Sequence, residues 1–160
     1  WSVSYFIDTL GIEQGKALVA LSYSVLGLIV MRVLIGSVLK NLNHNKLIFL
    51  SLLLFVLGSA GLLMNGYLFN SIGMFVLGAG LAPGFPVMLG IVGEMFKEVS
   101  GTAFSFAMFI ALIGNTIINY TTGLLTNYYG MQAYIFVVLG VIAFMILIYA
   151  VIIRLEKLNK

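Results

Sequence analysis

Two asparagines in a long uncharged stretch are the side chains of this sequence best suited to bind a polar molecule. Asn115 and Asn119 lie four residues apart, so a helix places them on the same face. An amide carries both donors and acceptors, and it therefore suits a solute whose hydroxyl groups offer both. The alternative is that the two amides hydrogen-bond to neighbouring helices. We expect them to contact a solute, and the adjacent Tyr120 either to line the same site or to belong to an aromatic belt.

Aromatic side chains form a second group of binding candidates. Trp1 and Tyr5 are four residues apart and share a helix face, which offers a platform for stacking on a ring-shaped solute. Trp and Tyr are also common at membrane interfaces, where they bind no solute. Phe85 stands beside a proline-containing break in another apolar stretch and is the third aromatic candidate.

Two prolines produce that break. Pro83 and Pro86 each remove an intrahelical hydrogen bond, so we expect a kink around them, with Gly84 between them. Broken helices occur within membranes where they line cavities. We therefore predict that this segment gates a cavity, the alternative being a static kink that only shapes packing.

A single charge lies within the apolar stretch 17–39. Arg32 precedes Lys40 by eight residues, which on a helix corresponds to a depth of about 12 Å. Its side chain can extend back to the membrane interface, or it can pair with Glu94 or Glu98. We predict that Arg32, Glu94 and the nearby Gly36 act in gating or structure rather than in solute binding.

No set of residues indicates an enzyme. The sequence contains no HExxH, GxSxG or P-loop motif, and its few acidic residues lie near the ends of apolar stretches or between them. The absence of cysteine excludes disulfides and thiolate metal sites. His44 lies in a polar turn, and we do not expect it to be a ligand. We expect no catalytic residue, no metal and no organic cofactor.

The composition places these candidates in lipid. Of 160 residues, 62% are hydrophobic and 8% are charged, and the mean hydropathy is +1.16. Soluble domains carry about 25% charged residues, and a soluble fold of this size could not bury so much apolar surface. The formal net charge of +3 does not indicate nucleic acid, because the basic residues cluster between the apolar stretches.

Charges and turn-forming residues divide the chain into membrane-spanning helices. No charged residue occurs from Leu47 to Gly93 or from Gly101 to Ile153, and each stretch is too long for one crossing of about 20 residues. Polar breaks at 65–71 and 126–130 divide each stretch in two. The sequence therefore predicts a single all-α, polytopic transmembrane bundle over residues 1–160. Its spans are a truncated one near 1–11 and five full ones near 16–40, 47–65, 71–94, 101–125 and 132–153.

The basic residues lie in alternate connections. One side of the membrane receives six of them, and the opposite side receives only Lys16. The positive-inside rule places the basic side in the cytoplasm. We therefore expect an integral protein of the inner or plasma membrane, with the loops 41–46 and 95–100 and the C-terminus cytoplasmic. The six residues are Lys40, Lys46, Lys97, Arg154, Lys157 and Lys160.

Glycine content distinguishes inner from outer spans. The 71–94 span contains six glycines, including Gly80 and Gly84 in a GxxxG pattern. Because glycine lets helix backbones approach closely, we expect this span to be central. The last span contains only Gly140 among bulky apolar side chains, and we expect it to face lipid.

Several segments of these spans resemble a known transporter family. These segments are similar to the seventh, eighth, tenth and eleventh helices of the major facilitator superfamily. These helices belong to its C-terminal six-helix half, and the likeness is to the fucose and glucose-galactose permease branch. The placement of both short loops and the C-terminal tail on the cytoplasmic side is also similar to that in this family. The segments are Trp1-Ser2 with Tyr5, Arg32 to Gly36, Gly78 to Pro86, Gly101 to Phe104, and Gly114 to Gly123.

The resemblance implies a secondary active transporter of a small polar solute, in particular a sugar. Two six-helix bundles would alternate access to a site between them. It also implies coupling to a proton gradient through carboxylates of an N-terminal half. Because Trp1 already lies in an apolar stretch, we expect the chain to be a fragment whose partners are that half, the solute and the lipid bilayer.

Two other functions remain open at this point. A facilitator that exports a drug or metabolite would suit the abundant Met and Phe. A standalone six-helix channel or scaffold would fold and insert alone, and a second hydrophobic half upstream in the gene would eliminate it.

Overall fold

The computed structural model describes residues 1–39, 42–64 and 66–158, with side chains described as far as Arg154. Across these residues every regular element is a helix, and five helices are long and apolar enough to cross a membrane. The predicted all-α transmembrane fold is confirmed. The elements are α1 (Ser2–Asp8), α2 (Gln14–Ser37), α3 (His44–Leu63), α4 (Tyr67–Met95), the 3-10 turn η1 (Lys97–Val99), α5 (Ser100–Tyr129) and α6 (Ala133–Leu158).

Several helices begin and end at residues other than those predicted. α3 begins at His44 because Asn43 caps it, accepting a hydrogen bond from the Asn45 amide at 3.4 Å. α5 continues through the predicted break at 126–130 as far as Tyr129. The break was placed wrongly because polar and aromatic side chains are common in helices at a membrane interface, where the headgroups solvate them.

The break predicted at 65–71 was also too long, since α4 already begins at Tyr67. The predicted span ends at 40 and 65 lie outside the described residues, as do the loop residue Asn41 and the basic residue Lys160.

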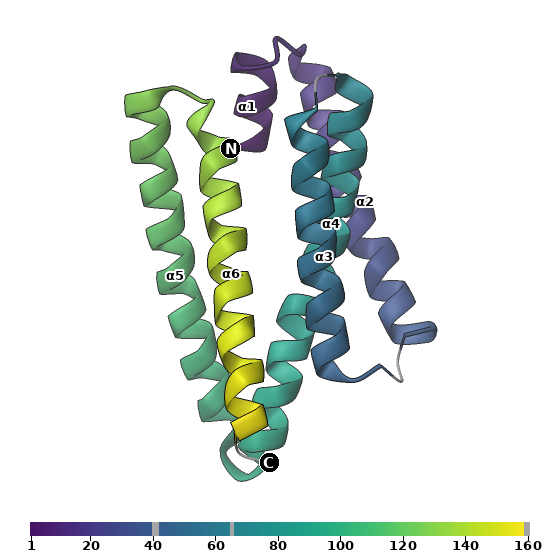
Figure 1. Cartoon of the computed structure of the whole chain (residues 1–160), viewed down its shortest axis with the longest axis vertical. Coiled ribbons are helices and arrows are strands. Elements are labelled where there is room, and N and C mark those ends of the chain that lie inside the picture. The colour runs from purple at the N-terminus through teal and green to yellow at the C-terminus, as the bar shows by residue number, and fades with distance from the viewer. Residues whose placement is uncertain (40–41, 65, 159–160) are drawn as a thin grey trace.

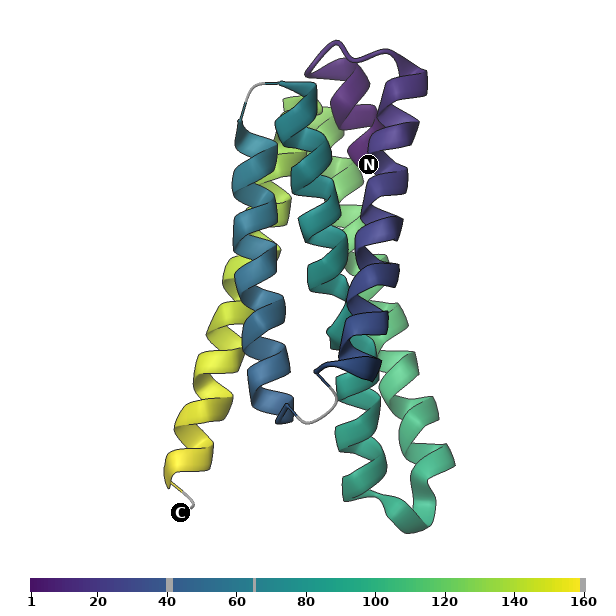
Figure 2. The same ribbon diagram turned by 90° about the vertical axis from the view of Figure 1, so that its right-hand side faces the viewer.

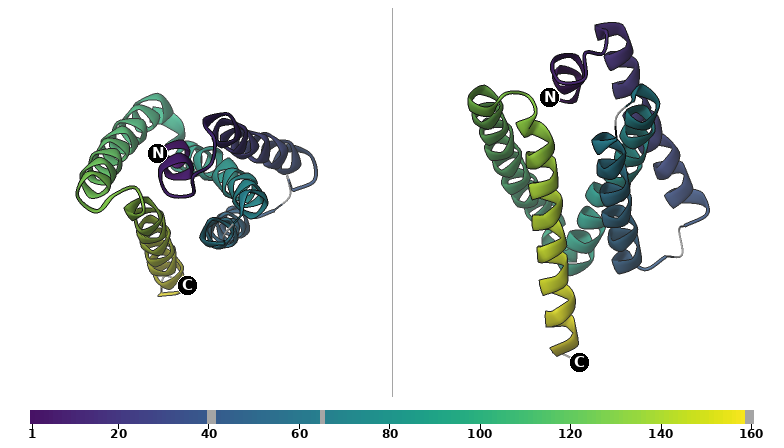
Figure 3. Two further views of the ribbon diagram at one scale, coloured as in Figure 1. Left: turned by 90° about the horizontal axis from the view of Figure 1, so that it is seen from above. Right: turned by 45° about the horizontal axis from the view of Figure 1, so that its top comes forward.

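α4 lies between α2 and α3 and packs closely against both (Figure 3). Glycines permit this approach. A Cβ on Gly27 of α2 would collide with the Phe75 carbonyl group of α4. On the other side, a Cβ on Gly61 of α3 would lie 2.8 Å from the Gly73 Cα of α4. The central position predicted for this span is confirmed, and α2, α3 and α4 form one closely packed unit, the α2–α4 unit.

Of the predicted GxxxG pair, only Gly80 lies at a helix contact. A Cβ on Gly80 would lie 3.2 Å from the Ser51 carbonyl oxygen of α3, and the buried Ser51 hydroxyl donates a hydrogen bond to the Gly80 carbonyl. A Cβ on Gly84 would have no neighbour within 4 Å. Among the described residues, no close helix contact therefore requires a glycine at position 84.

α5 and α6 form a hairpin beside the α2–α4 unit (Figure 1). α6 contacts α3, and the Tyr149 hydroxyl donates a hydrogen bond to the Asn45 carbonyl oxygen at 2.9 Å. Within α5 only Thr122 and Thr126 are buried. Most of the α5 surface is therefore uncovered by the rest of the chain.

The short helix α1 is held at one end of the bundle. Its Tyr5 and Phe6 are buried in a cluster with residues of α2, α3, α4 and α6, including Leu62, Met74 and Ile135. The Tyr5 ring packs at a tilt against the Phe6 ring. This cluster connects α1 to both the hairpin and the α2–α4 unit.

Three turns at the same end of the bundle contain a glycine with a left-handed backbone (Figure 1). The φ angles are 63° at Gly11, 131° at Gly66 and 79° at Gly130, which glycine adopts without a steric penalty. These turns join α1 to α2, α3 to α4 and α5 to α6. We call this end the glycine-turn end. The opposite end, which we call the C-terminal end, carries the other connections and the chain's C-terminus (Figure 2).

Candidate functional site

A chain of hydrogen bonds joins α1 to the polar face of α5. The Trp1 indole nitrogen Nε1 donates to the Asn119 side-chain oxygen Oδ1 at 3.0 Å. The Asn119 Nδ2 in turn donates to both the backbone oxygen and the side-chain oxygen of Asn115, each at 2.9 Å. The structure thus brings together three predicted binding residues, two of which lie 118 positions apart in the sequence. We call Asn115 and Asn119 the amide pair.

The amide pair retains hydrogen-bonding capacity on its exposed side. Both residues are exposed in this chain. Among the residues that the structure describes, Asn115 Nδ2 has no partner, so its two N–H groups are free to donate. The side-chain oxygens of Asn115 and Asn119 each use one of two lone pairs. The pair therefore offers two donors and two acceptors to a molecule that lies against it.

Two threonines extend the polar face of α5 toward the glycine-turn end. Thr122 and Thr126 are buried, and their hydroxyls donate to the Ile118 and Thr122 carbonyls at 2.7 and 2.8 Å. Sequence reasoning did not select them. Their spacing from Asn115 and Asn119 follows the periodicity of one helix face, and this spacing is the signal that would have found them.

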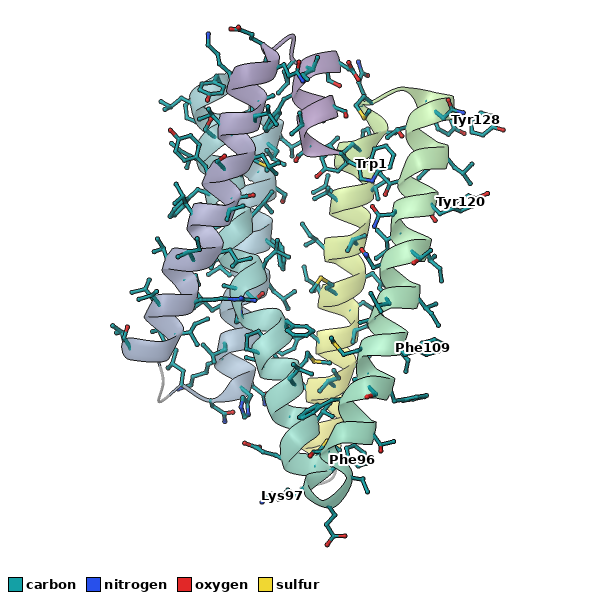
Figure 4. The ribbon with its side chains drawn as sticks, turned by 180° about the vertical axis from the view of Figure 1, so that it is seen from behind. Trp1, Phe96, Lys97, Phe109, Tyr120 and Tyr128 are labelled. Atoms are coloured by element: carbon teal, nitrogen blue, oxygen red, sulfur yellow. The ribbon has the colours of Figure 1, made fainter. Side chains whose placement is uncertain are left out.

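The Trp1 ring also lies against the backbone of α5. A Cβ on Gly123 would be 3.5 Å from the indole Cη2 atom and 3.7 Å from Cζ2. Trp1 itself remains 49% exposed. The indole thus reaches α5 across a surface that glycine leaves without a side chain (Figure 4).

The other aromatic candidates lie elsewhere. Tyr5 is buried against Phe6 and Tyr134, so in this conformation it packs in the core rather than beside the amide pair. Tyr120 is 70% exposed and projects from α5 on the side away from Trp1 (Figure 4). Phe85 of α4 is exposed as well.

The proline segment lies in the middle of α4. Pro83 is fully buried, whereas Pro86 is exposed. Neither proline has an N–H group, so the Ala79 and Ala82 carbonyls lose their helical partners. The C-terminal part of α4 leans from α2 and α3 toward α5 (Figure 1). The segment thus lies where α4 passes from the α2–α4 unit to the hairpin.

The predicted gating residues at the C-terminal end are separate from one another. Arg32 and Glu94 are exposed, and no ion pair joins Arg32 to Glu94 or Glu98 in the described part of the chain. A Cβ added to Gly36 would have no neighbour within 4 Å among the described residues. In this conformation the three residues do not form a joint contact.

The helix that carries the amide pair contains no charged residue from Ser100 to Tyr129. Of the charged residues in the other described helices, Arg32 of α2 lies farthest from a helix end. The others are Asp8, Lys16, Lys46, Glu94, Lys97, Glu98, Arg154, Glu156 and Lys157. The described residues also contain no group of three or more His, Asp or Glu placed to hold a metal ion. What the site offers is neutral hydrogen-bonding capacity.

A separate apolar groove of about 790 Å³ runs between α5 and α6. Its lining includes Ile117, Ile118, Phe136 and Phe144, with Gly140 leaving space between them. The residues of the amide pair do not line it. This groove and the amide pair are therefore distinct features of the hairpin.

Comparison with known proteins identifies the family. A family model described as the Major Facilitator Superfamily matches residues 2–160, nearly the whole chain. No curated protein matches the chain, and no solved structure matches it.

Proposed function

The chain belongs to the major facilitator superfamily and is part of a membrane transporter of that kind, and we propose that its cargo is a small, neutral, hydroxyl-bearing solute such as a sugar. The amide pair carries this proposal. It presents two donors and two acceptors on an uncovered helix face. A hydroxyl group donates one hydrogen bond and accepts others, so two neighbouring hydroxyls match the pair.

The absence of charge supports a neutral cargo. A charged solute would need an opposite charge at membrane depth, because an unpaired ion there is costly. The amide pair lies on α5, which contains no charged residue, whereas Arg32 lies on α2. This half of the site therefore favours solutes that hydrogen-bond without an ionic partner.

A second six-helix bundle would complete the site. α5 is uncovered over most of its surface, and its amide pair faces open space. In the alternating-access mechanism two bundles rock about a site between them. The second bundle would supply the remaining contacts to the solute. It would also supply titratable carboxylates within the membrane, which the described part of this half lacks, and these would couple transport to a proton gradient. The protein would then act as a solute–proton symporter.

The basic residues support one orientation. Lys46, Lys97 and Arg154 belong to the C-terminal end, and Lys16 to the glycine-turn end. The positive-inside rule then assigns the C-terminal end to the cytoplasm. The glycine turns would face the outside.

The groove between α5 and α6 supports an alternative cargo. A lining of isoleucine and phenylalanine suits an apolar drug or metabolite. The two proposals differ in the side chains that they require, since a solute in the groove makes no use of the amide pair.

The test uses Asn115→Ala in the polypeptide that contains this chain. Cells expressing it are assayed for uptake of radiolabelled D-glucose, D-galactose and L-fucose, and Thr116→Val serves as the control on the same helix. We expect uptake of at least one hexose to fall by tenfold or more, because two donors to the solute are lost. Unchanged uptake of every hexose would refute the sugar assignment. Loss of a drug-efflux activity after Ile117→Ala, with hexose uptake absent throughout, would favour the exporter.

A further inference from the structure

The contact between Trp1 and Asn119 lies on one side of the amide pair. α5 runs from the C-terminal end toward the glycine-turn end, so Asn115, Asn119 and Gly123 follow one another in that direction (Figure 4). The Trp1 indole contacts Asn119 and Gly123, the two residues nearer the glycine-turn end. Trp1 therefore lies beside Asn119 on the side of the pair that we assign to the outside.

The Trp1 side chain uses the same hydrogen-bonding capacity that a solute needs. Its Nε1 donates to the Asn119 oxygen, which is one of the acceptors of the pair. In an apolar environment a carbonyl oxygen without a donor is costly. When the site is empty the indole meets this need, and when a solute hydroxyl donates to the same oxygen the indole is no longer required.

The attachment of Trp1 allows it to leave without unfolding α1. Phe6 is fully buried and Tyr5 is nearly so, whereas Trp1 is half exposed at the first turn of the helix. The bond from Trp1 Nε1 to Asn119 is a hydrogen bond to a side chain, which can break without disturbing the cluster around Phe6. The residues that hold α1 in place are thus different from the side chain that bonds to Asn119.

We propose that Trp1 is a latch over the amide pair, which holds Asn119 when the transporter is empty and is displaced by the hydroxyl of an arriving solute. The proposal rests on the proposed function, because it assigns the competing ligand of the same site. It adds that the affinity for solute is lowered by an internal competitor, since a closed latch leaves only one of the two Asn119 oxygen lone pairs to the solute.

The main test is Trp1→Phe, which keeps an aromatic ring and removes the N–H donor. Binding of D-glucose, D-galactose and L-fucose is measured on the purified full-length polypeptide by titration calorimetry. We expect roughly two- to tenfold tighter binding, which corresponds to the net value of one hydrogen bond. Tyr128→Phe, a change in an exposed aromatic residue farther along α5, is the control and should leave the affinity unchanged.

Two further variants separate a latch from a merely structural role. Gly123→Val leaves both polar groups in place but fills the surface on which the indole lies, so it should tighten binding in the same direction as Trp1→Phe. In an Asn119→Leu background, Trp1→Phe should have no further effect on binding, because its partner is gone. Unchanged or weaker binding by Trp1→Phe would overturn the latch, and weaker binding would show that the indole contacts the solute directly.

A measurement without solute decides the latch even where no hexose binds. Trp1 is the single tryptophan of these 160 residues, and any other tryptophan of the full polypeptide is replaced by Phe. We expect Asn119→Leu to make the Trp1 fluorescence more accessible to acrylamide, because the indole loses its tether. Equal quenching in both proteins would refute the latch, whereas lost hexose binding with altered quenching would leave the latch standing and the sugar assignment refuted.

Discussion

Gly61 of α3 and Gly73 of α4 meet backbone to backbone, so that a Cβ on Gly61 would lie 2.8 Å from the Gly73 Cα. Gly58 adds to the same contact, since a Cβ on Gly73 would lie 2.9 Å from the Gly58 carbonyl oxygen. In lipid the helices gain little from burying apolar surface, and close packing takes its place. This contact is therefore a principal source of cohesion between α3 and α4.

We expect Gly61→Ala to destabilise the bundle. The added methyl group must push α3 and α4 apart, and overpacking of this kind costs about 1–3 kcal/mol. Thermal unfolding in detergent measures the change. The control is Gly140→Ala, where a Cβ has no neighbour within 4 Å and the transition should stay the same or rise slightly. Equal behaviour of the two variants would mean that α3 and α4 can separate at no cost.

Ser51→Ala removes a hydrogen bond between helices. The buried Ser51 hydroxyl donates to the Gly80 carbonyl oxygen of α4. We expect a loss of about 0.5–1.5 kcal/mol in the free energy of unfolding. Ser37→Ala is the matched control, because the Ser37 hydroxyl bonds to its own helix at the Val33 carbonyl. If both variants unfold alike, the link between α3 and α4 does not contribute to stability.

Asn70→Leu should raise stability. Asn70 is almost fully buried, and its Nδ2 donates to the Gly66 carbonyl at 2.9 Å, but its Oδ1 has no hydrogen-bond partner among the described residues. An unpaired buried acceptor costs about 1–3 kcal/mol, and leucine of similar size removes it. A higher unfolding temperature is expected, with the exposed Asn127→Leu showing no such rise. A lower unfolding temperature would show that a water molecule or a second bundle satisfies the Asn70 oxygen.

Pro86→Ala should slow transport while leaving solute affinity unchanged. Alanine restores the N–H donor to the Ala82 carbonyl. In a helix interior alanine is more favourable than proline by up to about 3 kcal/mol, so we expect a straighter and stiffer helix. Single-turnover and equilibrium-binding measurements separate the two effects. Met88→Ala, an exposed change two residues farther along α4, is the control. An unaltered transport rate would identify the kink as static.

The spans were predictable from the sequence because lipid offers no hydrogen bonds, so every backbone N–H and C=O group in the membrane needs a partner within the protein. Apolar runs of bilayer length in a chain of this kind form helices. The glycines of α4 indicate a helix that packs closely against neighbours on two sides. The helix ends were less predictable. Tyr129 and His44 lie inside helices although they are polar or aromatic, since headgroups and water solvate such residues equally well in a helix or a turn.

The candidate site was predictable only in part. The spacing of Asn115 and Asn119 placed both on one face, and the hydrogen bonds between them follow from it. The bond from Trp1 to Asn119 depends on where the short helix α1 docks, which the cluster around Phe6 determines and no local pattern reveals. The same docking buries Tyr5 in the core and leaves Trp1 half exposed, although the two residues are only four positions apart.

The three left-handed glycines also decide what the two faces of the membrane can offer to other macromolecules. Each of them lies in a short turn between two helices. A soluble protein that approaches this face would therefore meet short turns rather than long loops. Basic side chains lie at the opposite end, among them Lys46, Lys97 and Arg154. An epitope tag inserted beside Gly130 would have to pull α5 and α6 apart, and we expect it to destabilise the hairpin.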